Sequence, residues 1–302
     1  MFLPDFQAFA PTSLDEALAL LNKHGAEGAM PLAGGTDLIV RMKEGALRPR
    51  ILILLDRIPR LGIIEATGGR IRIGALATFD QLMHSDILHT SAPILIEAAG
   101  NVGSPQIRNR GTIGGNIANA SPCADTIPAL YVLEAEVILQ SVSGERRLPI
   151  ASCFKGSKES MLCSNEVLTY IEFPIPKQPE NFFYLTSGQR RALSINKLSV
   201  AGQISFAVEE TVTDARIAYG AVAPTVLRGV SVEAFLIGKK LTPDILEISS
   251  ELAQGEIRPI DDIRSTAEWR RNVTGVLLKR GLASIAAKNK KSESITEPDN
   301  KQ

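Results

Sequence analysis

Two glycine pairs carry the residue types best suited to hold a phosphorylated ligand. The first pair lies in the stretch LAGGTDLIV at residues 32–40, and the second lies in TIGGN at residues 112–116. Glycine permits positive φ angles and lets a ligand approach the main chain, and successive exposed N–H groups form a concavity that suits phosphate oxygens. Two such loops could hold the two phosphates of one dinucleotide from different sides.

Polar side chains flank both glycine pairs. Thr36 and Thr112 offer hydroxyl donors, and Asn116 offers an amide donor. Taken alone, a glycine pair is more typical of a tight turn than of a ligand site. The dinucleotide-binding fingerprint G-x-G-x-x-G does not follow the first strand, and the phosphate loop G-x-x-x-x-G-K-[ST] is absent. The residues alone therefore lead to a pyrophosphate-binding hypothesis and no further.

The composition indicates an ordinary globular protein of more than one structural unit. The chain has 302 residues, which is long for a single core. Thirty-three basic residues balance thirty-three acidic ones, so no electrostatic attraction to nucleic acid or an anionic membrane is expected. The start MFLPDFQAF lacks the features of a secretory signal, and the apolar runs are too short to cross a bilayer. We therefore predict a cytoplasmic protein with no membrane insertion.

The sulfur and imidazole groups do not indicate a metal site. The cysteines are widely spaced, which suits neither a disulfide framework nor a cysteine-rich metal site. The histidines have no partner at ligand spacing, and surface or helix-capping positions suit them better. These residues are Cys123, Cys153, Cys163, His24, His84 and His89.

An α/β unit surrounds the first glycine pair. Ser13 and Glu16 have the spacing of a capping box, and the apolar residues that follow repeat on one helix face as far as Gly25. A short buried strand in AMPLAGG runs into the glycine pair. A second strand, in RILILLDRI at residues 50–58, lacks polar alternation, which predicts a central position in a sheet.

A longer α/β region contains the second glycine pair. An alternating strand in GGRIRIG leads to a helix capped by Thr78 and Gln81, and helical character continues to Gly100. A helix is expected to begin near Asp125, followed by strands at residues 136–140 and in EVLTYIEFPIP. The proline-rich PKQPEN after them marks a boundary.

Beyond that boundary the pattern changes to paired strands and then helices. KLSVAGQISFAV and DARIAYGAV predict two antiparallel strands, and helices are expected at about 231–238, 243–253 and 265–288. Ser265 and Glu268 have the spacing of a capping box for the last helix.

Two long motifs resemble the FAD-binding (medium) subunit of the molybdenum hydroxylase family, of the xanthine dehydrogenase and carbon monoxide dehydrogenase type. They are PLAGGTDLIVRMK and GSPQIRNRGTIGGNIANASPCADTIPAL. The resemblance extends through GQRRALSINKLSVAG and AYGAVAPTVLR to STAEWRRNVTGVLLKRGL, and so covers almost the whole chain.

The resemblance implies an α+β fold with three parts. Two α/β subdomains of the p-cresol methylhydroxylase-type FAD-binding fold would hold the cofactor between them, followed by a C-terminal α+β domain with an antiparallel sheet and helices. On this sequence they correspond to residues 1–55, 56–176 and 177–288. The tail at 289–302 is charged and has no apolar period, which predicts disorder.

The resemblance also implies which residues contact FAD. The first motif would wrap the pyrophosphate through backbone N–H groups, and the second would hold it from the other subdomain. Val102 and Leu162 correspond to positions beside adenine, although apolar residues at such places are often core. Asp125 corresponds to a carboxylate that accepts a hydrogen bond from a sugar or ribityl hydroxyl, and it could also cap the following helix. The full set is Leu32, Ala33, Gly34, Gly35, Thr36, Asp37, Leu38, Val102, Thr112, Ile113, Gly114, Gly115, Asn116, Asp125, Leu162 and Thr186.

Two of these positions raise particular expectations. A phosphate would repel the Asp37 carboxylate, so we expect that group to accept backbone N–H bonds and brace its loop. Thr186 or Ser187 stands where many relatives carry a lysine near the flavin. The electron acceptor, NAD or another molecule, is therefore left open.

The function implied by the resemblance is electron transfer within a multi-subunit molybdenum hydroxylase. A large partner subunit would hold molybdopterin, and a small one would pass electrons through [2Fe–2S] clusters to FAD in this chain. Because the flavin carries the redox chemistry itself, no residue here is predicted to be catalytic. The alternatives are a stand-alone flavin-dependent oxidase or dehydrogenase, against which the scarcity of histidine argues, and a scaffold that has lost flavin, against which the intact glycine pairs argue.

Overall fold

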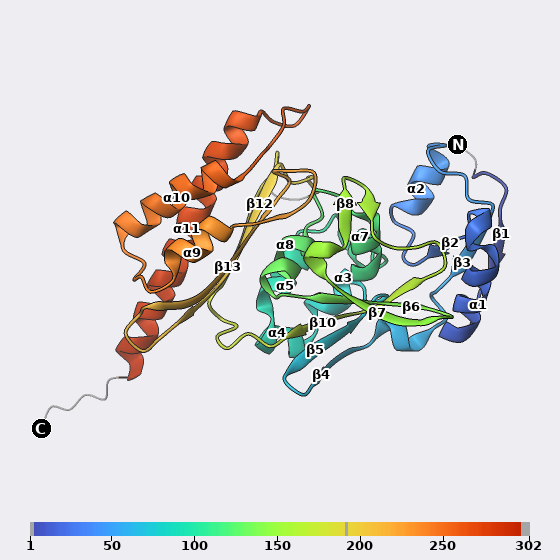
Figure 1. The fold of residues 1–302 in the computed structure, drawn as a ribbon, viewed down its shortest axis with the longest axis horizontal. Helices are drawn as coiled ribbons and strands as arrows, with labels where there is room; N and C mark the ends of the chain where they lie inside the picture. Colours follow the sequence, from blue (N-terminus) through green and yellow to red (C-terminus); the bar gives the residue numbers. More distant parts are fainter. Residues whose placement is uncertain (1–2, 191–192, 297–302) are drawn as a thin grey trace, which may run out of the picture.

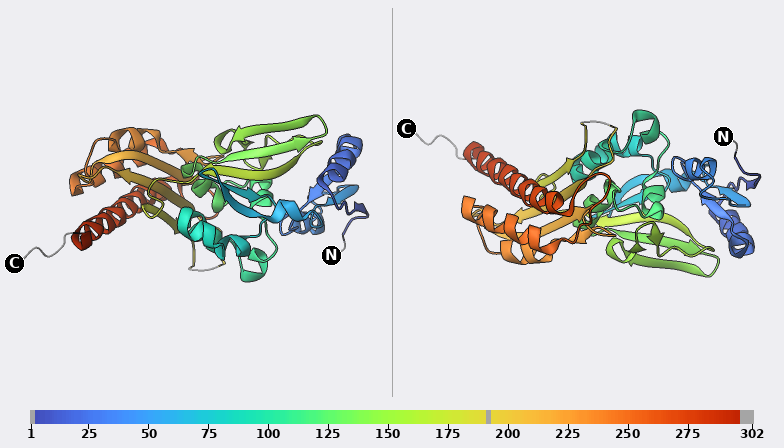
Figure 2. Two further views of the ribbon diagram at one scale, coloured as in Figure 1. Left: turned by 90° about the horizontal axis from the view of Figure 1, so that it is seen from below. Right: turned by 90° about the horizontal axis from the view of Figure 1, so that it is seen from above.

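The computed structural model describes residues 3–190 and 193–296 and arranges them as three parts in a row (Figure 1). The N-terminal part lies at one end, and the C-terminal sheet and helices lie at the other. A middle part built on a larger sheet separates them. Two further views show the same order along the long axis (Figure 2).

A small parallel sheet forms the N-terminal part. Its strands lie in the order β1 (Gln7–Phe9), β3 (Ile51–Leu54) and β2 (Met30–Leu32). The helix α1 (Leu14–His24) buries Ala17, Leu18 and Leu21 in the core of this part, as the apolar repeat predicted. β3 is the central strand, which confirms the prediction from its unbroken apolar run. The helix α2 (Leu38–Lys43) and a short turn of 3₁₀ helix, η1 (Gly25–Glu27), complete this part.

The start of α1 differs from the predicted capping box in one bond. The Ser13 hydroxyl accepts from the N–H of Glu16 at 3.2 Å, as expected. The Glu16 carboxylate, however, accepts from the N–H of Thr12 at 2.9 Å. The box predicted at Thr78 and Gln81 is complete in both directions.

A five-stranded antiparallel sheet forms the middle part. Its strands lie in the order β4 (Ile64–Thr67), β5 (Arg70–Gly74), β10 (Val167–Pro174), β6 (Glu136–Ser141) and β7 (Gly144–Pro149). Apolar side chains of this sheet form one core with those of the surrounding short helices. Those helices are α3 (Phe79–Met83), α4 (Asp86–Ser91), α5 (Pro93–Gly100), α7 (Ile113–Asn119) and α8 (Thr126–Val132), whereas α6 (Pro105–Arg108) has no buried residue. The hairpin of β8 (Phe154–Gly156) and β9 (Glu159–Ser160) and the 3₁₀ turns η2 (Pro59–Gly62) and η3 (Ile150–Ser152) complete this part.

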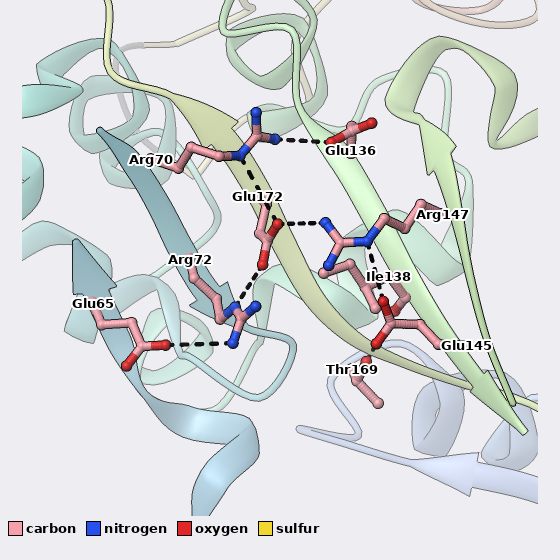
Figure 3. A network of polar contacts seen from close by, with 9 residues as sticks. All are labelled: Glu65, Arg70, Arg72, Glu136, Ile138, Glu145, Arg147, Thr169 and Glu172. Carbon is pink, nitrogen blue, oxygen red and sulfur yellow. Dashed lines mark hydrogen bonds and ion pairs between the residues drawn. The ribbon is translucent and has the colours of Figure 1, made fainter. Parts of the chain in front are cut away.

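Glutamates and arginines form a network across the strands of the same sheet (Figure 3). At its centre, the Glu172 carboxylate accepts from Arg72 Nε and from an Arg147 nitrogen, both at 2.6 Å. Glu172 is 7 % exposed, whereas both arginines keep about two fifths of their side chains exposed. Burial raises the pKa of Glu172, but the bonds from Arg147 and Arg72 outweigh it, so the pKa is lower than usual.

The C-terminal part packs helices against a four-stranded antiparallel sheet. The strand order is β11 (Phe182–Ser187), β12 (Leu198–Phe206), β13 (Val212–Gly220) and β14 (Leu227–Arg228). β12 and β13 are the pair predicted from the sequence, whereas β11 and β14 were not predicted. The helices are α9 (Val230–Leu236), α10 (Pro243–Glu256) and α11 (Ala267–Thr296).

The last helix begins and ends later than the sequence indicated. The Thr266 hydroxyl, not that of Ser265, accepts from the first turn, through the N–H of Trp269 at 3.2 Å. α11 continues past residue 288 to Thr296, which includes part of the predicted tail. The rest of that tail, residues 297–302, lies outside the described residues.

Candidate functional site

The first glycine pair forms an open loop between β2 and α2. Gly35 has a φ of +73°, which glycine adopts without strain. A Cβ atom on Gly34 would lie 1.8 Å from the carbonyl oxygen of Arg110, so only glycine lets this loop touch the middle part of the chain. Within the described residues, no N–H group of residues 33–37 donates a hydrogen bond. These N–H groups are therefore available to a ligand.

The second glycine pair lies in the first turn of the helix α7, not in a loop as we expected. A Cβ atom on Gly114 would lie 2.5 Å from the Cβ of Ala75 and 2.6 Å from its carbonyl oxygen. This glycine therefore lets α7 pack closely against the segment that follows β5.

The main-chain N–H groups of this turn are already used within the protein. The N–H of Ile113 donates to Ala77, and that of Gly114 donates to Ala75. The Thr112 hydroxyl accepts from the N–H of Gly115 at 3.1 Å and so caps α7. Of residues 112–116, only Thr112 has a main-chain N–H group without a partner among the described residues.

A side chain of α7 supplies a further donor on this side of the site. The Asn116 carbonyl oxygen accepts from the Thr126 hydroxyl at 2.7 Å. This bond leaves the amide nitrogen of Asn116 as the group that can donate to a ligand.

A cavity of about 620 Å³ separates the open loop from α7. Segment 160–168, which joins β9 to β10, and segments of the first part line it from other directions. Most of the predicted ligand-binding residues line this cavity: Leu32, Ala33, Gly34, Gly35, Thr36, Asp37, Leu38, Val102, Thr112, Gly114, Gly115, Asn116 and Leu162.

Three predicted residues do not line this cavity. Ile113 is fully buried in the core of the middle part. Thr186 lines a neighbouring cavity of about 610 Å³, together with Arg108 and Asn196. Asp125 is connected to that second cavity, because its carboxylate accepts from the Asn196 amide at 2.5 Å.

The two cavities lie on either side of one short segment. Val102 and Ile107 line the first cavity, whereas Gly103 and Arg108 line the second. The Arg108 guanidinium donates to the carbonyl oxygens of Val102 and Gly103, each at 3.2 Å, which fixes this segment. An elongated ligand could therefore extend from the open loop past residues 102–108 towards the C-terminal part.

Asp125 is a partly buried acceptor and not a helix cap. It stands at the N-cap position of α8, but its side chain accepts no bond from the first turn. Burial raises its pKa to about 6, against the opposing effect of the Asn196 bond. The Tyr184 hydroxyl also donates to its backbone carbonyl at 2.8 Å. Asp125 thus links the second motif to β11 and to the loop that follows it.

Comparison with known proteins identifies the chain. Residues 4–176 match the family model of the FAD binding domain in molybdopterin dehydrogenase, and residues 183–285 match that of the CO dehydrogenase flavoprotein C-terminal domain. The chain belongs to the FAD-binding medium subunits of the molybdenum hydroxylases. It is therefore a subunit of an FAD-dependent oxidoreductase, as the resemblance implied.

The relatives match this flavoprotein subunit over almost its whole length. The carbon monoxide dehydrogenase medium chain of Hydrogenophaga pseudoflava is 34% identical over 291 residues, which are 95% of this chain and 99% of that one. Its solved structure superposes with a TM-score of 0.88. The glyceraldehyde dehydrogenase medium chain of Sulfolobus acidocaldarius is 32% identical over 286 residues, covering 95% and 100% of the two chains.

A structural match at lower identity supports the same fold. Quinoline 2-oxidoreductase from Pseudomonas putida 86 superposes with a TM-score of 0.90 at 26% identity, and the match covers 95% of this chain and 99% of that one. The predicted α+β fold class of the flavoprotein subunit is thus confirmed.

The expectation for Asp37 in this flavoprotein is wrong. Its carboxylate caps no N–H group of α2. It faces two cations instead, Lys158 Nζ at 3.5 Å and an Arg41 nitrogen at 4.0 Å. The N–H groups of the loop are therefore left to a ligand, and the charge of Asp37 is balanced by side chains.

Several cavity-lining residues of the flavoprotein were not predicted. Segment 160–168 contributes Ser160, Cys163, Ser164 and Glu166 in addition to the predicted Leu162. Glu166 is 6 % exposed and accepts from Arg146 at 2.6 and 3.0 Å and from the N–H of Cys163 at 2.7 Å. Its burial raises the pKa, but these bonds outweigh it and leave the pKa lower than usual. The segment is thus held in shape by an ion pair whose partners are twenty residues apart.

Among residues 3–190 and 193–296, no three His, Cys, Asp or Glu side chains come together as metal ligands. No helix in those ranges combines the length and the apolar character that crossing a membrane requires.

Proposed function

We propose that FAD lies in the cavity between the first two subdomains, and that this chain is the electron-transfer subunit of a heteromeric molybdenum hydroxylase. The observation that carries the proposal is the open loop at residues 33–37, whose N–H groups have no partner among the described residues; this loop and Asn116 line the same cavity of about 620 Å³. Main-chain N–H groups in such a loop suit a diphosphate.

Each remaining part of the cofactor has residues that fit it. Val102 and Leu162 are partly buried and line the cavity, which suits the two faces of an adenine. Asp125 is an acceptor for a sugar or ribityl hydroxyl, and Thr186 lines the neighbouring cavity where the flavin ring would lie. Ile113 would contribute only through the core beneath the site.

When bound, FAD supplies one- and two-electron redox chemistry, which no side chain provides. The residues of this chain bind and orient the cofactor and keep water from part of its surface. We propose no residue of this chain as a general acid or base.

The partner subunits follow from the relatives. The relatives at 32% and 34% identity are named as medium chains, and the solved carbon monoxide dehydrogenase of Hydrogenophaga pseudoflava is described as lacking the Mo-pyranopterin moiety of its molybdenum cofactor. We therefore propose a large partner that holds molybdopterin and a small partner whose [2Fe–2S] clusters deliver electrons to FAD. The final acceptor would be NAD or another molecule, and a cytoplasmic location remains a prediction.

The two glycines of α7 provide a matched test of the cavity assignment. Gly115 lines the cavity, and a Cβ atom there meets only the Thr112 hydroxyl within 4 Å, whereas one on Gly114 would strike the backbone of Ala75. We expect Gly115→Val to abolish FAD retention and to lower the unfolding temperature less than Gly114→Ala does, because only the Thr112 hydroxyl, 2.9 Å from the added Cβ, has to move. Gly114→Ala should lower the unfolding temperature. Flavin absorbance per chain and thermal unfolding measure the two effects.

Gly255→Val is the control, because Gly255 is also helical and a Cβ atom there meets nothing within 4 Å. It should keep the full amount of FAD. A normal flavin content in Gly115→Val would contradict the proposed site. Rapid substrate oxidation by the isolated chain would instead support a stand-alone enzyme over a subunit.

A further inference from the structure

Lys158 lies at a fixed point beside the first cavity. It occupies the turn between β8 and β9 with a φ of +63°, a left-handed conformation that is unusual for a residue other than glycine. Its N–H donates to the carbonyl oxygen of Ala120 at 2.8 Å, and Ala120, at the end of α7, also has a positive φ of 49°. Two strained residues therefore join the hairpin to α7, and such strain persists only where the surrounding structure imposes it.

The Lys158 side chain reaches two cavity-lining residues from different subdomains. Its ammonium nitrogen lies 2.9 Å from the Asn119 side-chain oxygen on α7 and 3.5 Å from an Asp37 oxygen in the open loop. Both Asn119 and Asp37 line the first cavity. An ammonium group has three N–H donors, so these two contacts leave one donor for a further acceptor.

The charges around the open loop need such a cation. Asp37 places a carboxylate beside the N–H groups proposed to hold a diphosphate. The negative carboxylate and the negative diphosphate would repel each other. Arg41 is 4.0 Å from Asp37 and Lys158 is closer, at 3.5 Å. The other carboxylate that lines the cavity, Glu166, is already paired with Arg146. Together, Lys158 and Arg41 offset Asp37 and leave a net positive charge next to the loop.

We propose that Lys158 is a positioning residue for the cofactor: its ammonium group offsets Asp37 and donates to the diphosphate of FAD, and so ties α7 to the open loop across the cavity. This inference rests on the proposed function, and Lys158 lies outside both sequence motifs. The Lys158 side chain is 41 % exposed, so its contact with the diphosphate should weaken as salt concentration rises.

The test compares Lys158→Gln with Lys155→Gln, a control in the same hairpin. The Kd for FAD is measured on the FAD-free full chain by flavin fluorescence, at low and high NaCl. We expect Lys158→Gln to raise the Kd about tenfold at low salt, as for one lost hydrogen bond between charged groups. The salt dependence of its Kd should be shallower than that of the wild type. Lys158→Arg should keep the wild-type salt dependence, and Lys155→Gln should match the wild type throughout.

ADP and adenosine separate a phosphate contact from a structural one. Used as competitors of FAD, ADP should lose affinity in Lys158→Gln, whereas adenosine, which has no phosphate, should not. If Lys158→Gln keeps the wild-type Kd and salt dependence, the inference about Lys158 is overturned and the proposed function is not affected. Equal losses for ADP and adenosine, together with a lower unfolding temperature, would show a structural role and also overturn it. Failure of the wild-type chain to bind FAD would overturn the proposed function itself.

Discussion

Asp125 lies where α8 meets the C-terminal sheet, and we expect its replacement by asparagine to stabilise the protein at neutral pH. Its carboxylate accepts one side-chain bond, from Asn196, which is itself 8 % exposed. Burial raises the pKa of Asp125 from 3.8 to about 6. The ionised carboxylate is therefore less stable in the folded protein than in water.

The pH dependence of stability follows from this rise in the pKa of Asp125. Between pH 4 and pH 6 the folded chain binds the proton that the unfolded chain has already released, so Asp125 makes the free energy of unfolding fall as the pH rises. A rise in pKa from 3.8 to about 6 corresponds to about 3 kcal/mol. Most of this loss of stability, about 2 kcal/mol, occurs between pH 4 and pH 7.

Asp125→Asn removes the ionisable group and keeps an oxygen that can accept from Asn196. Urea unfolding of the FAD-free full chain, with two-state behaviour verified by two probes, measures the difference between variant and wild type. We expect little difference at pH 4 and a variant more stable by about 2 kcal/mol at pH 7. Asp5→Asn, at an exposed aspartate, should show no such change with pH. The same Asp125→Asn variant should bind FAD more weakly if the carboxylate accepts a cofactor hydroxyl.

A stability difference between Asp125→Asn and wild type that stays constant from pH 4 to pH 7 would refute the reasoning. So would a wild type that is more stable than the variant at pH 7. Either result would mean that Asp125 is well solvated or well paired when ionised. The expected result would instead place it among residues kept for ligand binding at the expense of stability.

Two further predictions concern the charge network of the middle sheet and the cysteines. Glu172→Gln should lower the free energy of unfolding, measured by urea unfolding, by about 2 kcal/mol. The reason is that it removes the buried charge shared by Arg72 and Arg147 (Figure 3). An unchanged free energy of unfolding would mean that solvent replaces the network. Of the three cysteines, the exposed Cys163 should react first with a thiol reagent, since Cys153 is buried and burial raises its pKa to about 12. Excess FAD should slow that reaction, because Cys163 lines the first cavity, and a rate unaffected by FAD would count against the proposed binding site.

Local sequence signals predicted the elements that depend on local chemistry. The apolar repeat and Ser13 fixed the position of α1, and Thr78 with Gln81 marked the start of α3. The adjacent strands β12 and β13 followed from their apolar runs. The cap of α11 was misplaced by one residue, because Ser265 and Thr266 both carry a hydroxyl and only the fold selects between them.

The cavity wall contributed by segment 160–168 could not be predicted from local patterns. Its shape depends on the ion pair between Glu166 and Arg146, and Arg146 lies on β7. Its approach to the first part of the chain depends on Gly25, where a Cβ atom would lie 2.4 Å from the carbonyl oxygen of Ser164. Contacts between residues this far apart in the chain leave no periodic signal in the sequence.

The two glycine pairs look alike in the sequence but serve different physical purposes. In the first, Gly35 takes a positive φ and the neighbouring N–H groups have no partner among the described residues. In the second, Gly114 allows α7 to touch Ala75, and the N–H groups are used within the protein. Glycine disfavours helices, so sequence alone favoured a loop at both places. The proposed site is therefore asymmetric: main-chain N–H donors would hold the ligand from the first subdomain, and side chains, above all Asn116, would hold it from the second.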